Sequence, residues 1–378
     1  MASPNARSKR HIEVALPQGA RYRAGDYLVV LPTNFPDNVE RALRRFGLSY
    51  DAQLEIRANR GATTHLPTDR PIAVGEILSS YVELCVPATR KQIEELAAST
   101  PCPPERAALE SLIAGDNVFN TEILQKRTSV LVLLERFASC ALPFASFLQM
   151  LPPLKPRQYS ISSSPAWSAE HCTITVAVVC APALGGNGVY HGCASSYLAQ
   201  ARPGAKVAVS VRPSNAAFHV PEQLDVPMIM VGSGSGVAPF RGFLQERALR
   251  AASEGARCGE AVLFFGCDAP DVDYLYKDQF AEWERQGLVR VHPAFASVGE
   301  GGVRYVQDRL WNDRDEVTRL MEKGARIYVC GDGRRMAPAV RDALCRIHRE
   351  ASRCSDEEMT AWLAELEKSV RYVQDVYA

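Results

Sequence analysis

The sequence predicts a multi-domain α+β protein: a β domain built as a barrel or sandwich, a helical insert within it, and then a doubly wound parallel α/β domain. Short segments typical of β-strands are separated by turn-forming residues. They flank a long stretch, residues 34–151, whose apolar residues recur with helical periodicity. After Pro227, buried strand segments alternate with helical segments, which is typical of a parallel sheet. A chain of 378 residues is long enough for two or three domains.

Charge and cysteine usage exclude several classes of function. Lys plus Arg and Asp plus Glu both number 43, so net charge gives no argument for nucleic acid or an anionic membrane. The 11 cysteines include no Cys-x-x-Cys pair, which argues against structural zinc or a disulfide framework and favours reduced thiols in the cytoplasm. No signal peptide is visible, and the apolar run Val130–Leu134 falls far short of a membrane span. Because the chain enters mid-domain sequence almost at once, we expect it to be part of a longer protein.

The first β elements are short. The segment Arg10–Leu16 alternates like a half-buried strand. A Gly25-Asp26 turn then leads into a buried strand at Tyr27–Leu31, which Pro32 ends. The helical block that follows shows cap signals, such as Thr89. It shows no catalytic spacing, so we interpret it as an insert.

The chain returns to β structure with Arg157-Gln158-Tyr159-Ser160. An Arg can bind a pyrophosphate through two parallel charged hydrogen bonds, a Tyr ring can face a flat heterocycle, and a Ser hydroxyl can donate to a ring nitrogen. These properties suit a flavin nucleotide. The alternative is a serine-rich strand that ends in a turn at Pro165.

A glycine-rich loop, 185–192, leads into a helix about 30 residues after Arg157. The first amides of that helix, around Gly192 to Ser195, form a typical anion site. The alternative is an ordinary glycine-rich hairpin. Further strands are predicted at 172–179, 207–211 and 217–220.

The α/β domain opens with a strand at Met228–Val231 that runs into a loop with alternating glycines, Gly232 to Gly236, and then a helix. Such a turn allows close approach of a phosphate, although its spacing is not the Rossmann G-x-G-x-x-G. Further parallel strands are predicted at 261–265, 288–291 and 327–330, with ligands at their carboxyl ends. Cys330 stands at one such end, where it is either a site residue or a buried structural cysteine.

The last elements are a helix with a capping box at Ser355 and an aromatic C-terminus, 370–378. Chain ends are normally polar and frayed. The terminus is therefore either a final strand of the sheet or a segment that places Tyr377 on a ligand.

Taken in order, the motifs Arg-x-Tyr-Ser, Gly-x-Ala-Ser, Gly-x-Gly-x-Gly-Val-Ala-Pro-Phe-Arg, Cys-Gly-Asp-Gly and terminal Asp-Val-aromatic resemble the ferredoxin-NADP reductase superfamily. The chain is most similar to the diflavin reductases, and among them to the FAD/NADPH part of self-sufficient cytochrome P-450 monooxygenases. This resemblance implies three domains: an antiparallel FAD-binding β-barrel at 1–35 and 152–222, a helical connecting insert at 36–151, and an NAD(P)H-binding domain at 223–378.

The resemblance also implies roles for individual residues. For FAD, it implies pyrophosphate binding by Arg157 and the amides of Gly192, Cys193, Ala194 and Ser195, ring stacking by Tyr159, a place near the flavin N5 for Ser160, and contacts along the rest of FAD from Thr175 and Ala177. For NAD(P)H, it implies binding by Gly232, Gly234, Ser235, Gly236, Cys267, Ser297, Arg304, Tyr305, Gly331 and Asp332. Ser160, Cys330 and Asp375 would line the hydride path, and Tyr377 would cover the flavin face until nicotinamide displaces it.

The function implied is transfer of hydride from NADPH to FAD, with electrons passed on to FMN in a flavodoxin-like domain and then to a cytochrome P-450 haem. The FMN and haem domains would belong to the same parent polypeptide and are not in this chain. Alternatives are the same module from a stand-alone cytochrome P-450 reductase, a nitric-oxide-synthase type or a sulfite-reductase type of enzyme. A rival of another class is a module that binds a nucleotide without turnover.

Several positions depart from the family pattern. Ala296, Ser297 and Val303 stand where the family has Ser-Arg and Lys for the NADPH 2′-phosphate, and Asp268 stands where it often has Arg near the adenine end. Tyr377 replaces the usual Trp. Because each charged hydrogen bond is worth about 1.5–3 kcal/mol, these losses predict that NADH serves beside NADPH.

Overall fold

The computed structural model describes residues 8–57, 63–186, 188–214 and 217–377, and the chain divides into two compact units. Residues 1–7, within the predicted first domain, lie outside the described residues. One unit contains 1–29, 158–177 and 209–378; the other contains 30–157 and 178–208. Among the described residues no helix has the length and apolar character needed to cross a membrane.

The larger unit is built on a five-stranded parallel sheet, which confirms the predicted α/β domain. The strand order is β12-β11-β10-β13-β14, so the chain starts in the middle and reverses direction between β10 and β13. The aromatic C-terminus is the edge strand β14, one of the two alternatives predicted for it. The strands are β10 Met228–Ser233, β11 Ala261–Cys267, β12 Arg290–Phe295, β13 Arg326–Asp332 and β14 Tyr372–Tyr377.

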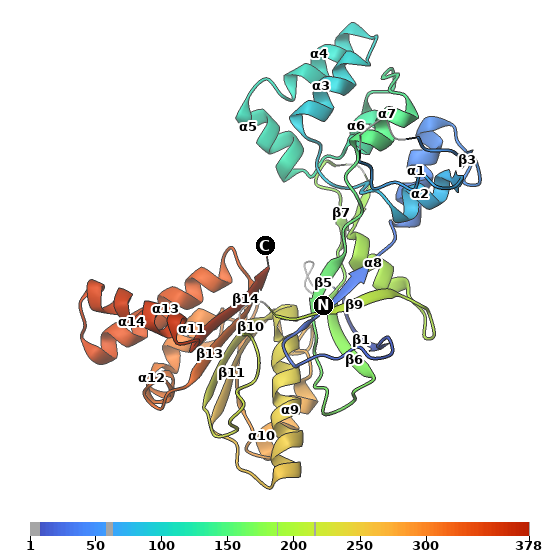
Figure 1. Cartoon of the computed structure of the whole chain (residues 1–378). Helices are drawn as coiled ribbons and strands as arrows, with labels where there is room; N and C mark the ends of the chain where they lie inside the picture. The colour runs from blue at the N-terminus through green and yellow to red at the C-terminus, as the bar shows by residue number, and fades with distance from the viewer. Residues whose placement is uncertain (1–7, 58–62, 187, 215–216, 378) are drawn as a thin grey trace. The chain divides into compact units, whose positions relative to one another are not determined.

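Helices cover both faces of this sheet (Figure 1). Successive side chains of a strand point to opposite faces, and the buried residues divide accordingly into two cores. Val231 and Val329 belong to the core shared with α11–α14, whereas Met230 and Tyr328 belong to the core shared with α9 and α10. The sheet is therefore doubly wound, as predicted. The helices are α9 Ala238–Glu254, α10 Lys277–Arg285, α11 Val306–Asn312, α12 Arg314–Glu322, α13 Met336–Ser352 and α14 Asp356–Lys368; η2 Gly234–Val237 and η3 Glu300–Gly302 are short 3-10 turns.

The remaining β elements form small sheets. Strand β1 pairs antiparallel with β6, and β5, β2 and β9 form a three-stranded sheet. A bridge between Ile161 and Ile174 links β6 to the residue after β5. These strands are β1 Lys9–Ala15, β2 Tyr27–Leu31, β5 Arg157–Ser160, β6 His171–Ala177 and β9 Ala208–Arg212.

The prediction of a strand at residues 217–220 is wrong. Ala217 has a φ of 51°, in the left-handed region that a strand excludes. The apolar character that suggested a strand belongs to Phe218, which is fully buried in the core beside α9.

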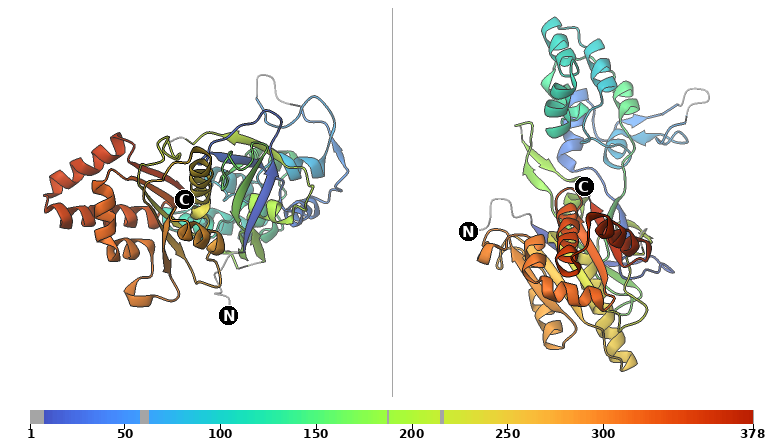
Figure 2. Two further views of the ribbon diagram at one scale, coloured as in Figure 1. Left: turned by 90° about the horizontal axis from the view of Figure 1, so that it is seen from below. Right: turned by 90° about the vertical axis from the view of Figure 1, so that its left-hand side faces the viewer.

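The smaller unit is mostly helical, and its helices between residues 36 and 150 gather in one group (Figure 2). Its core is one continuous apolar cluster that runs from Val39 to Leu151. The predicted cap at Thr89 is present as a full capping box with Gln92, and Ser129 caps the helix after it. The elements are α1 Pro36–Phe46, β3 Gln53–Leu54, β4 Ile72–Ala73, α2 Val74–Ser80, α3 Arg90–Ala98, α4 Pro103–Ser111, α5 Asp116–Phe119, the π-helix η1 Asn120–Gln125, α6 Val130–Arg136, α7 Phe144–Met150, β7 Cys180–Pro182, β8 Val189–His191 and α8 Cys193–Gln200.

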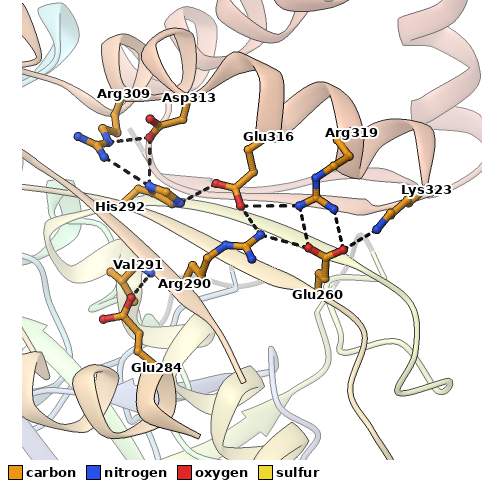
Figure 3. A network of polar contacts seen from close by, with 10 residues as sticks. All are labelled: Glu260, Glu284, Arg290, Val291, His292, Arg309, Asp313, Glu316, Arg319 and Lys323. Atoms are coloured by element: carbon orange, nitrogen blue, oxygen red, sulfur yellow. Dashed lines mark hydrogen bonds and ion pairs between the residues drawn. The ribbon is translucent and has the colours of Figure 1, made fainter. Parts of the chain in front are cut away.

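The amino edge of the parallel sheet carries a network of ion pairs (Figure 3). Glu260, just before β11, accepts hydrogen bonds from both terminal nitrogens of Arg319 at 2.6 and 2.7 Å and from Lys323 at 2.6 Å. Arg290 lies 3.2 Å from Glu260 and also contacts Glu316. The network extends through His292, whose ring nitrogens lie 3.0 and 2.9 Å from Asp313 and Glu316. It ties the start of β11 and β12 to α12.

Candidate functional site

The candidate site lies at the carboxyl edge of the parallel sheet, where β10 and β13 are neighbours. Open α/β sheets bind ligands where the strand order reverses, outside the carboxyl ends of the strands. In this sheet Gly232 of β10 pairs with Cys330 of β13, which in turn pairs with Asp375 of β14. Three of the predicted site residues are thus brought to one point by strand register.

The glycine loop after β10 lies against β13. A Cβ atom on Gly236 would stand 2.3 Å from the carbonyl oxygen of Cys330, closer than any side chain permits. Gly234 has a φ of 54°, the left-handed region that favours glycine. These constraints explain why the loop needs glycines, and they place its backbone at the end of the sheet.

A carboxylate with hydroxyl donors on both oxygens marks the centre of this edge. Ser160 Oγ donates to Asp375 Oδ2 at 2.9 Å, and Tyr27 Oη donates to Oδ1 at 2.7 Å. Cys330 Sγ lies 3.9 Å from Oδ2. The structure therefore brings together Ser160, Cys330 and Asp375, three residues that the family resemblance named, and adds Tyr27, which no motif indicated.

The donors around Asp375 remain protonated near neutral pH. Burial, reinforced by the adjacent Asp375 carboxylate, raises the pKa of the Cys330 thiol well above its ordinary value. Burial and the same carboxylate also raise the pKa of Tyr27. The cluster is thus one carboxylate surrounded by neutral donors.

Four other predicted residues stand at the same edge. Tyr377, at the end of β14, is 52% exposed, and its hydroxyl lies 3.4 Å from Ser235 Oγ of the glycine loop. Asp332 accepts hydrogen bonds from the amides of Arg334, Arg335 and Met336 at 3.1, 2.5 and 3.3 Å. These bonds, that from Arg335 above all, lower the pKa of Asp332. The carboxylate of Asp332 therefore caps the first turn of α13, and Gly331 beside it has a φ of 145°.

The residues predicted for the adenosine end lie at the carboxyl ends of β11 and β12. Ser297 Oγ donates to the carbonyl oxygen of Asp268 at 2.6 Å, and Arg304 Nε donates to that of Ala296 at 3.3 Å. Tyr305 is 53% exposed, whereas Cys267 is buried, which raises its pKa to about 12. Oδ2 of Asp268 is buried, and no donor among the described residues reaches it.

In the smaller unit, Arg157 is held by a buried acid. Its Nη2 lies 2.9 Å from Glu83 Oε1, and its Nη1 donates to the carbonyl oxygen of Lys155. Glu83 is nearly inaccessible and also accepts from the Lys155 amide at 3.0 Å, while the Arg157 side chain is 37% exposed. The guanidinium is thus fixed in orientation with part of its surface in solvent.

The predicted anion site is the first turn of α8. The Gly192 amide donates to the carbonyl oxygen of Val179 at 2.8 Å, and Ser195 Oγ accepts from the Val179 amide at 3.0 Å. A Cβ atom on Gly192 would stand 2.7 Å from both Val179 Cβ and Ser195 Oγ. The Gly192 amide is therefore used within the protein. Cys193, Ala194 and Ser195 supply the first-turn amides, which have no intrahelical acceptor.

Other predicted flavin contacts lie on β5 and β6. Tyr159 is partly buried on β5, and Ala177 pairs with Lys9 at the end of β6. Thr175 Oγ1 lies 2.6 Å from Tyr276 Oη, which is also 2.9 Å from His11 Nδ1. The Thr175 hydroxyl is thus engaged within the protein. The predicted site residues are held by side chains from distant parts of the chain, namely Glu83, Tyr27 and Tyr276. No local sequence motif indicated these contacts.

Comparison with known families bears directly on this geometry. Residues 2–197 match the family model described as FAD binding domain. The chain belongs to this family. Residues 230–342 match a second model, described as oxidoreductase NAD-binding domain, and this match runs from within β10 through the glycine loop to beyond β13. The FAD-binding and NAD-binding assignments predicted from the motifs are therefore confirmed.

Curated relatives resemble the whole chain. A bifunctional cytochrome P450/NADPH–P450 reductase of Bacillus cereus is 43% identical over 377 residues, which cover 100% of this chain and 35% of that protein. A second such reductase, of Bacillus subtilis, is 44% identical over 373 residues, 99% of this chain and 35% of that protein. A self-sufficient cytochrome P450 monooxygenase of Phanerodontia chrysosporium is 45% identical over 365 residues, 96% of this chain and 34% of that protein. This chain thus spans about a third of the length of these relatives.

Proposed function

We propose that this chain is the FAD- and NADPH-binding part of a reductase whose electrons go to an FMN-containing flavodoxin-like domain and then to a cytochrome P-450 haem. The observation that carries the proposal is the cluster of Ser160, Cys330 and Asp375 at the reversal point of the nucleotide-binding sheet. The relatives' names supply the class of partner, and the third of their length that this chain spans leaves room for both partner domains in one polypeptide.

The residues present suit FAD. Arg157, fixed by Glu83, offers a partly exposed cation, and the first-turn amides of α8 offer donors, so both would hold the pyrophosphate. Tyr159 would lie against one face of the ring and Tyr377 against the other. Thr175 and Ala177 would support the remainder of the molecule. When bound, FAD supplies the hydride-accepting ring and releases electrons singly.

The nicotinamide nucleotide would be held at the carboxyl edge of the sheet. The loop Gly232–Gly236, together with Gly331 and Asp332, would face its phosphates, while Cys267, Ser297, Arg304 and Tyr305 would face the adenosine end. Displacement of Tyr377 would admit the nicotinamide beside Ser160, Cys330 and Asp375. The protein's contribution is orientation of the two rings and exclusion of water.

The same proposal includes the finer architecture. The strands of the two small sheets, β1-β6 and β5-β2-β9, would be parts of an antiparallel barrel at 1–35 and 152–222 that binds FAD. The helices of 36–151 would form the connecting insert, and 223–378 the NAD(P)H domain. We place the protein in the cytoplasm, in keeping with its free cysteines. A stand-alone diflavin reductase of the cytochrome P-450, nitric-oxide-synthase or sulfite-reductase type has the same module.

The proposal departs from the family pattern in the choice between NADPH and NADH. Arg304 is a cation beside the lost Ser-Arg positions, where its Nε donates to the carbonyl oxygen of Ala296 at 3.3 Å. Without the two other cations, we expect NADH to reduce the protein well beside NADPH. A thousandfold preference for NADPH would contradict this and would assign the 2′-phosphate to Arg304.

Anaerobic titration of the purified, FAD-loaded protein with NADPH and NADH tests the function. We expect the flavin absorbance near 450 nm to bleach, with ferricyanide reduced in turnover and cytochrome c not reduced in the absence of the FMN domain. A protein that binds FAD but is bleached by neither nicotinamide would be a binding module rather than a reductase. Addition of the separate FMN domain should restore cytochrome c reduction.

A further inference from the structure

The carboxylate of Asp375 is held from both sides. Ser160 and Cys330 approach Oδ2, whereas Tyr27 donates to Oδ1 at 2.7 Å. Asp375 belongs to β14, while Tyr27 and Ser160 belong to β2 and β5, which are neighbours in another sheet. We propose that Tyr27 is a positioning residue that fixes the Asp375 carboxylate for hydride transfer, an inference that rests on the function proposed above.

The fold directs Tyr27 towards Asp375 through the turn before β2. Gly25 has a φ of 103°, and a Cβ atom there would stand 1.8 Å from the carbonyl oxygen of Phe218. The following Asp26 accepts from the amides of Arg23 and Ser214 at 2.8 and 3.0 Å. Leu28, the next residue, is fully buried, so strand alternation turns Tyr27 to the opposite face. The start of the strand is therefore pinned, and the phenol has little freedom.

Fixing one oxygen of the Asp375 carboxylate also fixes the direction in which the other oxygen points. With Oδ1 held by Tyr27, the carboxylate cannot rotate, and Oδ2 stays directed at Ser160 and Cys330, the two groups that the proposed function places beside the reacting rings. The titratable groups around Asp375 are Tyr27 from β2 and Cys330 from β13, with Asp332 and Tyr377 at the same edge; Ser160 from β5 is neutral. Because burial and Asp375 raise the pKa of Tyr27, the phenol remains a donor over the working pH range.

Substitution of Tyr27→Phe removes one hydroxyl and tests this role. Reduction of bound flavin by NADPH, measured by stopped flow, should slow about 10-fold, since a hydrogen bond to a charged group is lost. The apparent Kd for NADPH from the same traces should stay close to the wild-type value, because the lost contact acts on the geometry of the reacting groups and not on nucleotide binding. Flavin content should be unchanged.

Tyr22→Phe is the matched control. Tyr22 is buried in the same unit and its hydroxyl lies 3.0 Å from Ser163 Oγ and 3.2 Å from the His171 carbonyl oxygen, with no contact to Asp375 among its hydrogen bonds. It should lose comparable stability yet keep the wild-type rate of flavin reduction. If Tyr27→Phe does not fold, Tyr27→His, which keeps a ring N–H donor, takes its place and should retain a rate within about threefold of wild type at pH 7.5; a larger loss overturns the proposal.

A double-mutant cycle of Tyr27→Phe with Asp375→Asn separates positioning from mere structure. Thermal unfolding of the FAD-loaded variants measures whether the contact between Tyr27 and Asp375 contributes to stability. The same cycle on the rate of flavin reduction measures whether the contact contributes to hydride transfer. Coupling in both supports the proposal. Coupling in thermal unfolding alone would mean that Tyr27 has only a structural role. Coupling in neither measurement would mean that the two side chains do not interact in solution. Either outcome overturns the proposal. A wild-type protein that neither nicotinamide reduces would instead defeat the proposed function.

Discussion

The two edges of the parallel sheet use charge in opposite ways. At the amino edge the carboxylate of Glu260 pairs with three cations, those of Arg319, Lys323 and Arg290 (Figure 3). At the carboxyl edge the Asp375 carboxylate meets neutral hydroxyl and thiol groups instead. Ion pairs satisfy both charges and leave nothing for a ligand, whereas neutral donors leave the negative charge uncompensated. This difference supports an assignment in which the amino edge provides cohesion and the carboxyl edge serves the proposed chemistry.

The backbone of the carboxyl edge is constrained as well. The carboxyl edge contains Gly234 and Gly331 with φ values of 54° and 145°, and Gly236 in a position that no larger residue fits. Such positions restrict the sequence and are typical of places where a backbone approaches a ligand. We therefore expect substitutions at the carboxyl edge to affect flavin reduction, and those at the amino edge to affect stability.

The largest effect should come from Ser160→Ala. Loss of the hydroxyl that donates to Asp375 should slow flavin reduction by NADPH about 10- to 100-fold, because a charged hydrogen bond contributes about 1.5–3 kcal/mol. The melting temperature should change by no more than a few degrees. Stopped-flow absorbance and thermal unfolding measure the two quantities. A variant that unfolds readily but reduces its flavin at the wild-type rate would reverse the assignment of the carboxyl edge.

The regular parts of this edge were predictable from sequence. Apolar runs such as Met228–Val231, followed by alternating glycines, identify a strand and a close turn, because only glycine permits that backbone. The order of such motifs identified the family. The error at 217–220 arose because an apolar residue, Phe218, was buried by a loop with left-handed geometry rather than by a strand.

The residues that hold the site's side chains in place could not be predicted from the sequence, because they make their contacts over long sequence separations. Tyr27 reaches Asp375 across 348 residues, and Glu83 reaches Arg157 across 74. Local periodicity says only that Tyr27 lies on the face opposite Leu28; which side chain it meets depends on the packing of two sheets. The same holds for Thr175, whose hydroxyl faces Tyr276.

A smaller effect is expected within the carboxyl edge from Asp268→Arg. The backbone carbonyl oxygen of Asp268 accepts from Ser297 Oγ, and Oδ2 of its carboxylate is buried with no donor among the described residues. A cation there should attract the 2′-phosphate, so the ratio of kcat/KM for NADPH to that for NADH should rise about 10-fold. Asp271→Arg, three residues further along the loop, is the control for added positive charge. An equal rise in both variants would indicate a general charge effect and not a contact with the phosphate.

The smallest effect should come from Glu260→Gln at the amino edge. Arg319, then Lys323, lower the pKa of Glu260 below its ordinary value of 4.5. A carboxyl whose folded-state pKa is lowered stabilises the protein above the unfolded-state pKa and loses that contribution as pH falls through the folded-state value. At pH 7 the substitution should therefore cost about 1 kcal/mol, a modest value because the group is partly exposed, and the cost should shrink below pH 4 and in 1 M salt. Urea unfolding at several pH values measures it.

Glu254→Gln, which breaks one exposed pair with Arg250, should cost far less than Glu260→Gln, since a network loses several pairs at once. Flavin reduction should keep the wild-type rate in both variants, because the affected charges lie at the edge of the sheet away from Asp375. A Glu260→Gln protein that reduces its flavin as slowly as Ser160→Ala would mean that the strands transmit the amino-edge charges to the carboxyl edge. The two edges would then act as one system, and the division between cohesion and chemistry would fail.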